Sequence, residues 1–298
     1  MTLLQHGSWF RRIAATLALY AALAVPTACT NKTAFDRLTE ARRLSSELLI
    51  QFARASNAAN QAVMADTDEA SVAFAKQADD TRKAIRTDVD TLGPLLRDLG
   101  YADETRLVEK FAKEFAEYSE LDRRILELAV ENTNLKAQRL SFGESQQAAD
   151  AFEQSLDAIA HAASSSDTWR VRALVAEAIA ALRDIHVAQA PHIAEADDAV
   201  MTRIEQRMKT SEASVRSALE SLRPIVPSST QPRLAAARAA LDRFMALNAQ
   251  IVDLSRRNTN VRSLMLSLNE KGKLTSACEK TLRSLQEALA RRGPAASR

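Results

Sequence analysis

The chain has 298 residues, of which 46% are hydrophobic and 26% charged, so it can bury a core and is not a disordered protein. It contains only 6 Gly and 7 Pro, and its runs of Ala, Leu, Arg, Glu and Gln favour helices. The composition predicts an all-α protein and argues against an α/β enzyme. The formal net charge of +2, together with an export signal, argues against nucleic-acid binding.

The first 29 residues have the order of a secretory signal. A pair of arginines and no acidic residue precede an apolar stretch at 13–25, and small residues lead to Cys29. The stretch has about 13 residues, fewer than the roughly 20 that cross a bilayer as a helix, so we expect cleavage and export to the periplasm.

Two processing sites remain open. Ala22-Leu23-Ala24 fits an ordinary cleavage site, while Cys29 resembles a lipidation site, although Pro26 stands where lipoprotein signals usually have Leu. A lipid on Cys29, or an uncleaved signal, would tether the protein to the membrane.

The rest of the chain carries one more cysteine and no second apolar span. No stretch of about 18 apolar residues follows Cys29, so we expect no second membrane crossing. We expect Cys278 to be a buried free thiol. The alternative is a disulfide with Cys29, which requires that Cys29 is neither removed nor lipidated and that the termini meet.

Apolar residues recur at intervals of three and four over 44–63 and again over 74–99, which predicts amphipathic helices of about 30 residues. Turn-forming residues separate the helices at 66–69, 100–103 and 164–167, and the last Asp or Ser of each break is the expected N-cap.

An internal repeat with a displacement of 126 residues is the most informative feature of the sequence. Leu121, Ile125, Leu128 and Asn132 reappear as Leu247, Ile251, Leu254 and Asn258. Upstream, the displacement is 129 to 130 residues. We therefore expect two copies, at 33–163 and 164–292, before a disordered tail at 293–298. Each copy has the length of an up-down four-helix bundle of long antiparallel helices with coiled-coil-like packing, so we predict two such bundles in tandem.

The third break of each copy is an Asn-Thr-Asn motif, in which Asn132, Thr133 and Asn134 recur as Asn258, Thr259 and Asn260. The apolar spacing passes through the motif without losing phase, as it would in a continuous helix. Such a helix would be about 90 Å long and would leave its far half without a packing partner. We therefore predict a turn at each motif, because Asn and Thr hydrogen-bond locally to the backbone.

Charge divides unevenly between the two halves of the sequence. Residues 33–160 hold 16 basic and 24 acidic residues, a net charge of −8, whereas 161–298 hold 21 and 14, a net charge of +7. This difference is either ordinary variation of solvated helix faces or a sign that the copies, or two chains head to tail, dock on each other.

Isolated candidate sites carry little signal. Trp169, Arg170 and Arg172 stand at the junction of the copies, where we expect the tryptophan to pack between the bundles under exposed arginines; contact with an anion or ligand is the alternative. His186 and His192 are six residues apart, which is not the spacing of paired helical metal ligands. No catalytic arrangement, phosphate-binding loop or haem motif is recognisable. We therefore expect no metal, no cofactor and no enzymatic activity.

Phe115–Tyr118, followed by Ile125–Ala129, a polar turn and a helix ending near Ile159, resembles the four-helix-bundle sensory module of methyl-accepting chemotaxis receptors. The second copy is similar over 254–264. The resemblance covers nearly all of the chain after the signal and rests mostly on helical periodicity. It implies a periplasmic bundle that binds a small ligand or a binding-protein partner and passes a small helix shift through the membrane.

The chain departs from that family because it has no second membrane helix and no cytoplasmic signalling segment, and no ligand-binding arginine arrangement carries over. We therefore expect a stand-alone periplasmic sensory or ligand-binding module that acts through a separate membrane receptor or envelope protein. A monomer and a homodimer are both compatible with the sequence. The alternative is a structural or adaptor protein of the cell envelope that binds no small molecule.

Overall fold

The computed structural model describes residues 33–163 and 168–293, and all regular secondary structure in these ranges is helical. The prediction of an all-α protein is confirmed. The predicted signal segment with Cys29, the break at 164–167 and the tail from 294 lie outside the described residues. Within the described ranges, no helix is both long and apolar enough to span a bilayer.

Ten α-helices lie in these ranges: α2 (Ala34–Met64), α3 (Asp68–Asp98), α4 (Ala102–Glu131), α5 (Thr133–Leu140), α6 (Gln146–Ala162), α7 (Thr168–Ala194), α8 (Asp198–Leu222), α9 (Gln231–Arg257), α10 (Thr259–Leu266) and α11 (Gly272–Arg291). A π-helical turn, η1 (Ser141–Ser145), joins α5 to α6, and a second, η3 (Ser267–Lys271), joins α10 to α11. A short 3-10 turn, η2 (Ser228–Thr230), precedes α9. Helices α2, α3 and α4 have 31, 31 and 30 residues, close to the expected length.

The helix breaks near residues 66 and 100 lie where the sequence places them, but the two N-caps differ from the expectation. Thr67 caps α3, since its Oγ1 accepts a hydrogen bond from the Ala70 N–H at 3.1 Å, and Asp68 is already helical. Gly100, with a φ of 72°, ends the turn after α3 in the left-handed region that favours glycine. Tyr101 then precedes α4 without a side-chain cap, so Asp103 lies in the first turn of α4.

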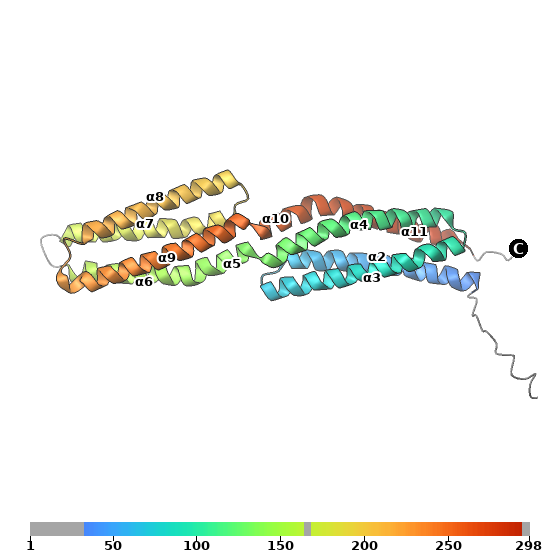
Figure 1. Cartoon of the computed structure of the whole chain (residues 1–298), viewed down its shortest axis with the longest axis horizontal. Helices are drawn as coiled ribbons and strands as arrows, with labels where there is room; N and C mark the ends of the chain where they lie inside the picture. Colours follow the sequence, from blue (N-terminus) through green and yellow to red (C-terminus); the bar gives the residue numbers. More distant parts are fainter. Residues whose placement is uncertain (1–32, 164–167, 294–298) are drawn as a thin grey trace, which may run out of the picture.

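Two groups of four long helices lie end to end (Figure 1). The first bundle contains α2, α3, α4 and α11, and its core joins an aromatic cluster on α2 and α4 to apolar residues of α11, among them Leu282 and Leu285. The second bundle contains α6, α7, α8 and α9 and encloses a separate core that includes Phe152, Leu182 and Phe244. Arg42 of α2 donates to the Leu289 carbonyl oxygen of α11 at 3.1 Å, so both described ends of the chain lie at the same end of the molecule.

The bundles do not coincide with the predicted copies at 33–163 and 164–292. Helix α6 belongs to the first copy but packs on α9 and α7, and α11 belongs to the second copy but packs on α4 and α2. The predicted turns at the Asn-Thr-Asn motifs are therefore wrong: α4 leads onward through Asn132 into α5, and α9 leads through Asn258 into α10 (Figure 1). The two copies exchange their last helices, so the far half of each long helical run packs against helices of the other copy. This is the packing partner that the sequence argument did not find for a continuous helix.

This exchange also removes the predicted opposition of charge. The first bundle, residues 33–132 with 258–293, holds 21 basic and 23 acidic residues, a net charge of −2. The second bundle, residues 133–257, holds 15 of each and is neutral. The charge difference between the halves of the sequence is therefore not a difference between the bundles, and electrostatics gives no reason for the bundles to dock on each other.

Candidate functional site

The two Asn-Thr-Asn motifs meet where the long helices cross between the bundles, and we call these six residues the joint. Asn132 and Asn258 adopt left-handed backbone conformations, with φ of 51° and 52°, and each interrupts its long helix by a single residue. The Thr133 N–H donates to Thr259 Oγ1 at 3.2 Å, and the Thr259 N–H donates to Thr133 Oγ1 at 3.1 Å. The first N–H groups of a helix have no partner within that helix. At the joint, the threonine hydroxyl of each copy accepts a hydrogen bond from such an N–H group of the other copy.

The asparagines of the joint extend the same reciprocal pattern. The Asn134 and Asn260 N–H groups donate to each other's Oδ1, at 3.1 and 3.2 Å. Asn134 Nδ2 donates to Asn258 Oδ1 at 2.8 Å, and Asn260 Nδ2 donates to Asn132 Oδ1 at 2.9 Å. All six residues of the predicted motif therefore come together, as one nearly two-fold symmetric connection. Most of their polar groups bind each other and neighbouring backbone, and Asn132 Nδ2 is the exception, since it is buried without a hydrogen-bond partner among the described residues.

The two π-helical turns are also related by 126 residues, and each turn faces a polar layer inside its bundle. In the second bundle this layer is neutral. The Ser141 hydroxyl donates to Gln189 Oε1 at 2.7 Å, and Gln189 Nε2 donates to Asn248 Oδ1 at 2.9 Å. Amide and hydroxyl groups satisfy one another there, which keeps the buried layer free of charge.

In the first bundle the equivalent layer is charged. Asp122 stands at the repeat position of Asn248, and Lys271 at that of Ser145. Asp122 Oδ1 lies 2.7 Å from Lys271 Nζ and Asp122 Oδ2 lies 2.6 Å from Arg82 Nη1. We call Arg82, Asp122 and Lys271 the buried ion cluster, since they are only 6%, 0% and 2% exposed.

The buried ion cluster holds two cations and one anion. Burial lowers the pKa of Lys271, and the attraction of Asp122 opposes that shift. Asp79 binds the outer edge of Arg82, with Oδ1 3.1 Å from Nη2, but it also binds Lys83. The buried ion cluster therefore has one more cation than anion, and the partly exposed carboxylate of Asp79, shared with Lys83, lies at its outer edge.

A groove of about 480 Å³ lies between α3 and α4 and is lined by Arg82 of the ion cluster. Its lining residues are Asp79, Arg82, Arg86, Val89, Asp90, Ala112, Phe115, Ala116, Ser119, Glu120 and Arg123. Ser119 is only 5% exposed, and its Oγ has no hydrogen-bond partner among the described residues. The Arg86 side chain likewise makes no hydrogen bond or ion pair with any residue that the structure describes. This α3–α4 groove thus contains an unpaired guanidinium and an unpaired buried hydroxyl.

The carboxylates of the groove differ in how far cations neutralise them. A hydrogen bond from Lys83 outweighs burial and lowers the pKa of Asp79, and a hydrogen bond from Arg123 does the same for Glu120. Asp90 is exposed and has no ion-pair partner within the described ranges. The groove therefore offers one unpaired cation, Arg86, with one unpaired anion a helical turn further along α3.

The predicted site at Trp169, Arg170 and Arg172 lies away from the joint. Trp169 is 73% exposed at the start of α7, so the expectation that it packs between the bundles is wrong. The exchange of helices is the reason, since the boundary between the sequence copies falls at the far end of the second bundle (Figure 1). Arg172 lines a groove of about 520 Å³ between α6 and α7, which Trp169 and Arg170 do not line. The described lining of that groove contains no polar side chain that is both nine-tenths buried and unpaired.

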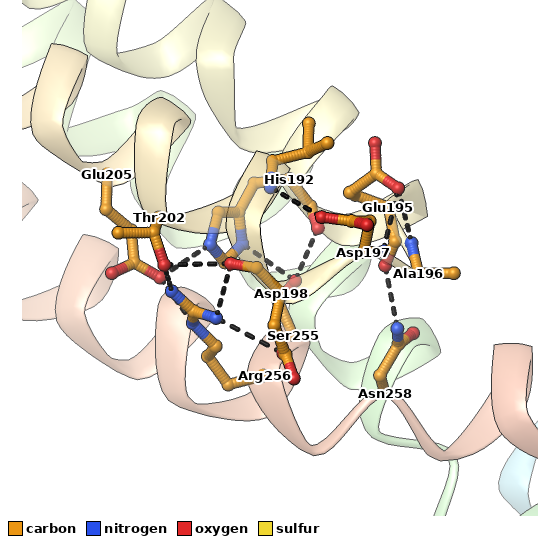
Figure 2. Close-up of polar contacts among 11 residues, drawn as sticks. His192, Glu195, Ala196, Asp197, Asp198, Thr202, Glu205, Ser255, Arg256 and Asn258 are labelled. Atoms are coloured by element: carbon orange, nitrogen blue, oxygen red, sulfur yellow. Dashed lines mark hydrogen bonds and ion pairs between the residues drawn. The ribbon is translucent and has the colours of Figure 1, made fainter.

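His192 is the centre of a polar cluster close to the joint (Figure 2). Its ring is fully buried, with Nδ1 2.8 Å from Ser255 Oγ and Nε2 2.9 Å from Glu205 Oε1. Arg256 Nε donates to the same Glu205 oxygen at 2.6 Å. Burial acts to raise the pKa of Glu205, but the hydrogen bonds from Arg256 and His192 together outweigh it, so the pKa lies below its usual value.

This serine, histidine and glutamate do not form a nucleophilic site. The Ser255 hydroxyl donates its hydrogen to the His192 carbonyl oxygen at 2.7 Å, so towards the ring it can only accept. The hydroxyl is therefore not oriented to give its proton to the ring, and Ser255 is fully buried. The cluster ties α7, α8 and α9 together.

The remaining candidates from the sequence occupy separate places. His186 contacts the Ser141 carbonyl oxygen at 3.2 Å, a different partner from those of His192, and the described residues contain no group of three potential metal ligands. Cys278 is buried, as predicted, and has no disulfide partner among the described residues; burial raises the pKa of its thiol to about 12. A bridge to Cys29 is untested, because Cys29 lies outside the described residues.

Sequence reasoning missed the buried ion cluster and the α3–α4 groove. The signal was present in the repeat, because Asp122 and Lys271 occupy positions whose counterparts in the other copy are neutral. Their burial follows only once α11 is placed beside α4, which the predicted turns excluded. Comparison with family models, with curated proteins and with solved structures gave no match to this chain.

Proposed function

We propose that this protein is an exported ligand-binding module of the cell envelope that acts in signal transduction through a separate membrane partner. The α3–α4 groove is the observation that carries the proposal, because it combines a volume of about 480 Å³ with an unpaired cation and an unpaired buried hydroxyl. Pockets for small molecules typically have about 300–1,000 Å³ and a few converging polar groups. The sequence supports export, and the resemblance to chemoreceptor sensory bundles supports sensing.

A ligand in this groove would act on a connected set of groups. Arg82 lines the groove and holds Asp122, and Asp122 holds Lys271 in η3. Turn η3 belongs to the long helical run that leads back through Asn258 into the second bundle. A ligand that prefers one arrangement of α3 and α4 would therefore shift the population of the arrangements at the joint, which a partner protein can read.

A thermal-stability screen of residues 30–298 against amino acids, organic acids and aromatic compounds tests this function. A ligand present at about 100 times its Kd stabilises the folded form by roughly 2.7 kcal/mol. We expect a saturable rise in Tm for one compound class, and we expect Ala116→Trp, which fills the groove, to abolish it. Ala176→Trp is the matched control, because it places the same side chain in the α6–α7 groove. No response to any compound, or equal responses in both variants, would contradict the proposal.

A structural or adaptor role is the second candidate, and exposed apolar residues favour it. Leu264 and Met265 of α10 and Leu268 of η3 are all exposed on adjoining helical turns. Exposed apolar side chains that gather in this way are typical of interaction surfaces. Light scattering of the wild type and of Leu268→Glu tests this role: the adaptor function requires an assembly that the variant weakens, and a monomer at all concentrations argues against self-association.

A further inference from the structure

We propose that the ligand of the α3–α4 groove is a small organic anion with a single negative charge, bound by the guanidinium of Arg86 and the hydroxyl of Ser119. This inference rests on the proposed function, since it names the chemical class that the same groove accepts. A carboxylate satisfies both groups at once, because its two oxygens accept hydrogen bonds from an arginine and from a hydroxyl.

The charge beneath the groove favours an anion. The buried ion cluster has two cations against the single carboxylate of Asp122, and its Arg82 forms part of the groove lining. Low polarisability around buried charges strengthens their field at the groove relative to that of exposed charges. Arg86 adds an unpaired cation at the next turn of α3.

The outer lining limits the ligand to one negative charge. Asp90 lies one turn beyond Arg86 and is unpaired within the described ranges, while Asp79 and Glu120 are already bound to cations. A second anionic group on the ligand would therefore meet carboxylates and no free guanidinium. Val89, Ala112, Phe115 and Ala116 supply the apolar part of the lining, which suits a ligand with a hydrocarbon or aromatic portion.

The second copy of the repeat provides an internal comparison. Arg216 on α8 stands at the repeat position of Arg86, but it is neutralised by Glu212 at 2.9 Å and Asp242 at 3.1 Å. Glu212 is the counterpart of Arg82. Because the first bundle has an arginine where the second has this glutamate, Arg86 lacks the carboxylate that Arg216 binds. The counterpart of Ser119 is Met245. The unpaired groups are therefore particular to the first bundle and are not a property of the repeat.

Titration calorimetry of residues 30–298 with sodium benzoate, at constant ionic strength, tests the proposal. Benzamide serves as the neutral probe of the same shape and phthalate as the doubly charged one. We expect saturable benzoate binding and at least tenfold weaker binding of benzamide and phthalate. Arg86→Gln should weaken benzoate binding at least tenfold and Ser119→Ala about fivefold, which corresponds to one hydrogen bond. Arg216→Gln should leave it unchanged, which controls for the loss of any exposed arginine.

The outcomes separate this inference from the proposed function. If benzamide binds as tightly as benzoate, and Ala116→Trp abolishes both, the groove is a ligand site but the assignment to anions is wrong. If benzoate binds equally to wild type and to Arg86→Gln, the named residues are wrong. If neither probe binds and the wider screen also shows no response, both proposals fail.

Discussion

Single residues distinguish the two bundles more than their backbones do. The π-helical turns, the joint and the long helices recur at a nearly constant displacement, yet Asp122 replaces Asn248 and Lys271 replaces Ser145. At the level of the His192 cluster, next to the joint, the second bundle is the polar one and the first is apolar. His192 and Ser255 of the second bundle stand where the first bundle has Val63 and Ala129. The first bundle therefore carries a charged layer beneath the groove, and the second carries one next to the joint.

The charged layer of the second bundle makes stability depend on acidic pH. The folded-state pKa of Glu205 lies below its usual value of 4.5, because hydrogen bonds from Arg256 and His192 outweigh its burial. This stabilisation is fully present above the unfolded-state pKa and is lost as the pH falls through the lower folded-state pKa. We expect Glu205→Gln to be less stable than the wild type at neutral pH, and the difference to shrink below about pH 4.5.

Urea denaturation from pH 3 to pH 7 measures this pH dependence. Glu117→Gln removes an exposed carboxylate from the other bundle and serves as the control, whose stability should follow that of the wild type. A difference between Glu205→Gln and the wild type that stays constant across this pH range would show that the Glu205 charge does not matter in the folded state.

Among the elements, the joint shows how two interrupted helices stabilise each other. Thr133→Val removes an acceptor from the Thr259 N–H, and a buried unpaired donor costs about 1–3 kcal/mol. Thr259→Val has the reciprocal effect on Thr133. Each substitution also breaks the hydrogen bond between Thr133 Oγ1 and Thr259 Oγ1, which lie 3.2 Å apart. Because both single variants lose this bond, we expect the double variant to be destabilised by less than the sum of the single variants, with a coupling of roughly 0.5–3 kcal/mol. Denaturant titration of the four proteins measures it, with the exposed Thr91→Val as control; strict additivity would mean that the two threonines do not interact.

Sequence periodicity predicts elements well and their connections poorly. The helix lengths and the breaks near residues 66 and 100 follow from apolar spacing and turn residues, and the repeat marks both Asn-Thr-Asn motifs. Apolar spacing that continues unchanged through the motif is equally compatible with a turn and with a helix that runs straight on past a single left-handed residue. The course of the chain after Asn132 depends on which helices are available to pack against it, and this is a property of the whole chain. The buried ion cluster depends on that choice and was unpredictable for the same reason.

At the scale of the molecule, the second bundle is a continuous insertion into the first. Residues 133–257 contain all of the second core, whereas the first core needs α11 beside α2, α3 and α4. We expect residues 133–257 alone to unfold cooperatively as a helical protein. The sequence copy 33–163 lacks α11 and keeps α6 without its partners, so we expect no cooperative monomer from it. Circular dichroism with urea compares the two fragments.

A complementation experiment completes this prediction. Residues 33–132 mixed with a peptide of residues 258–293 should recover cooperative unfolding, because together they supply the whole first bundle. A peptide of residues 133–163, which contains the α6 of the first copy, is the matched control and should not restore it. Cooperative folding of 33–163 as a monomer would contradict the observed exchange of helices.

The exchange of helices also sets an order of events during synthesis. Helices α2, α3 and α4 leave the ribosome first, but α11 follows about 140 residues later, which is roughly 10 to 30 s at ordinary rates of translation. The apolar faces that α11 covers stay open during that interval, while the second bundle is completed as soon as α9 emerges. A chain that stops short of its last 30 residues would therefore damage the bundle made first and spare the one made second. The final helix of the chain therefore decides whether the N-terminal bundle closes.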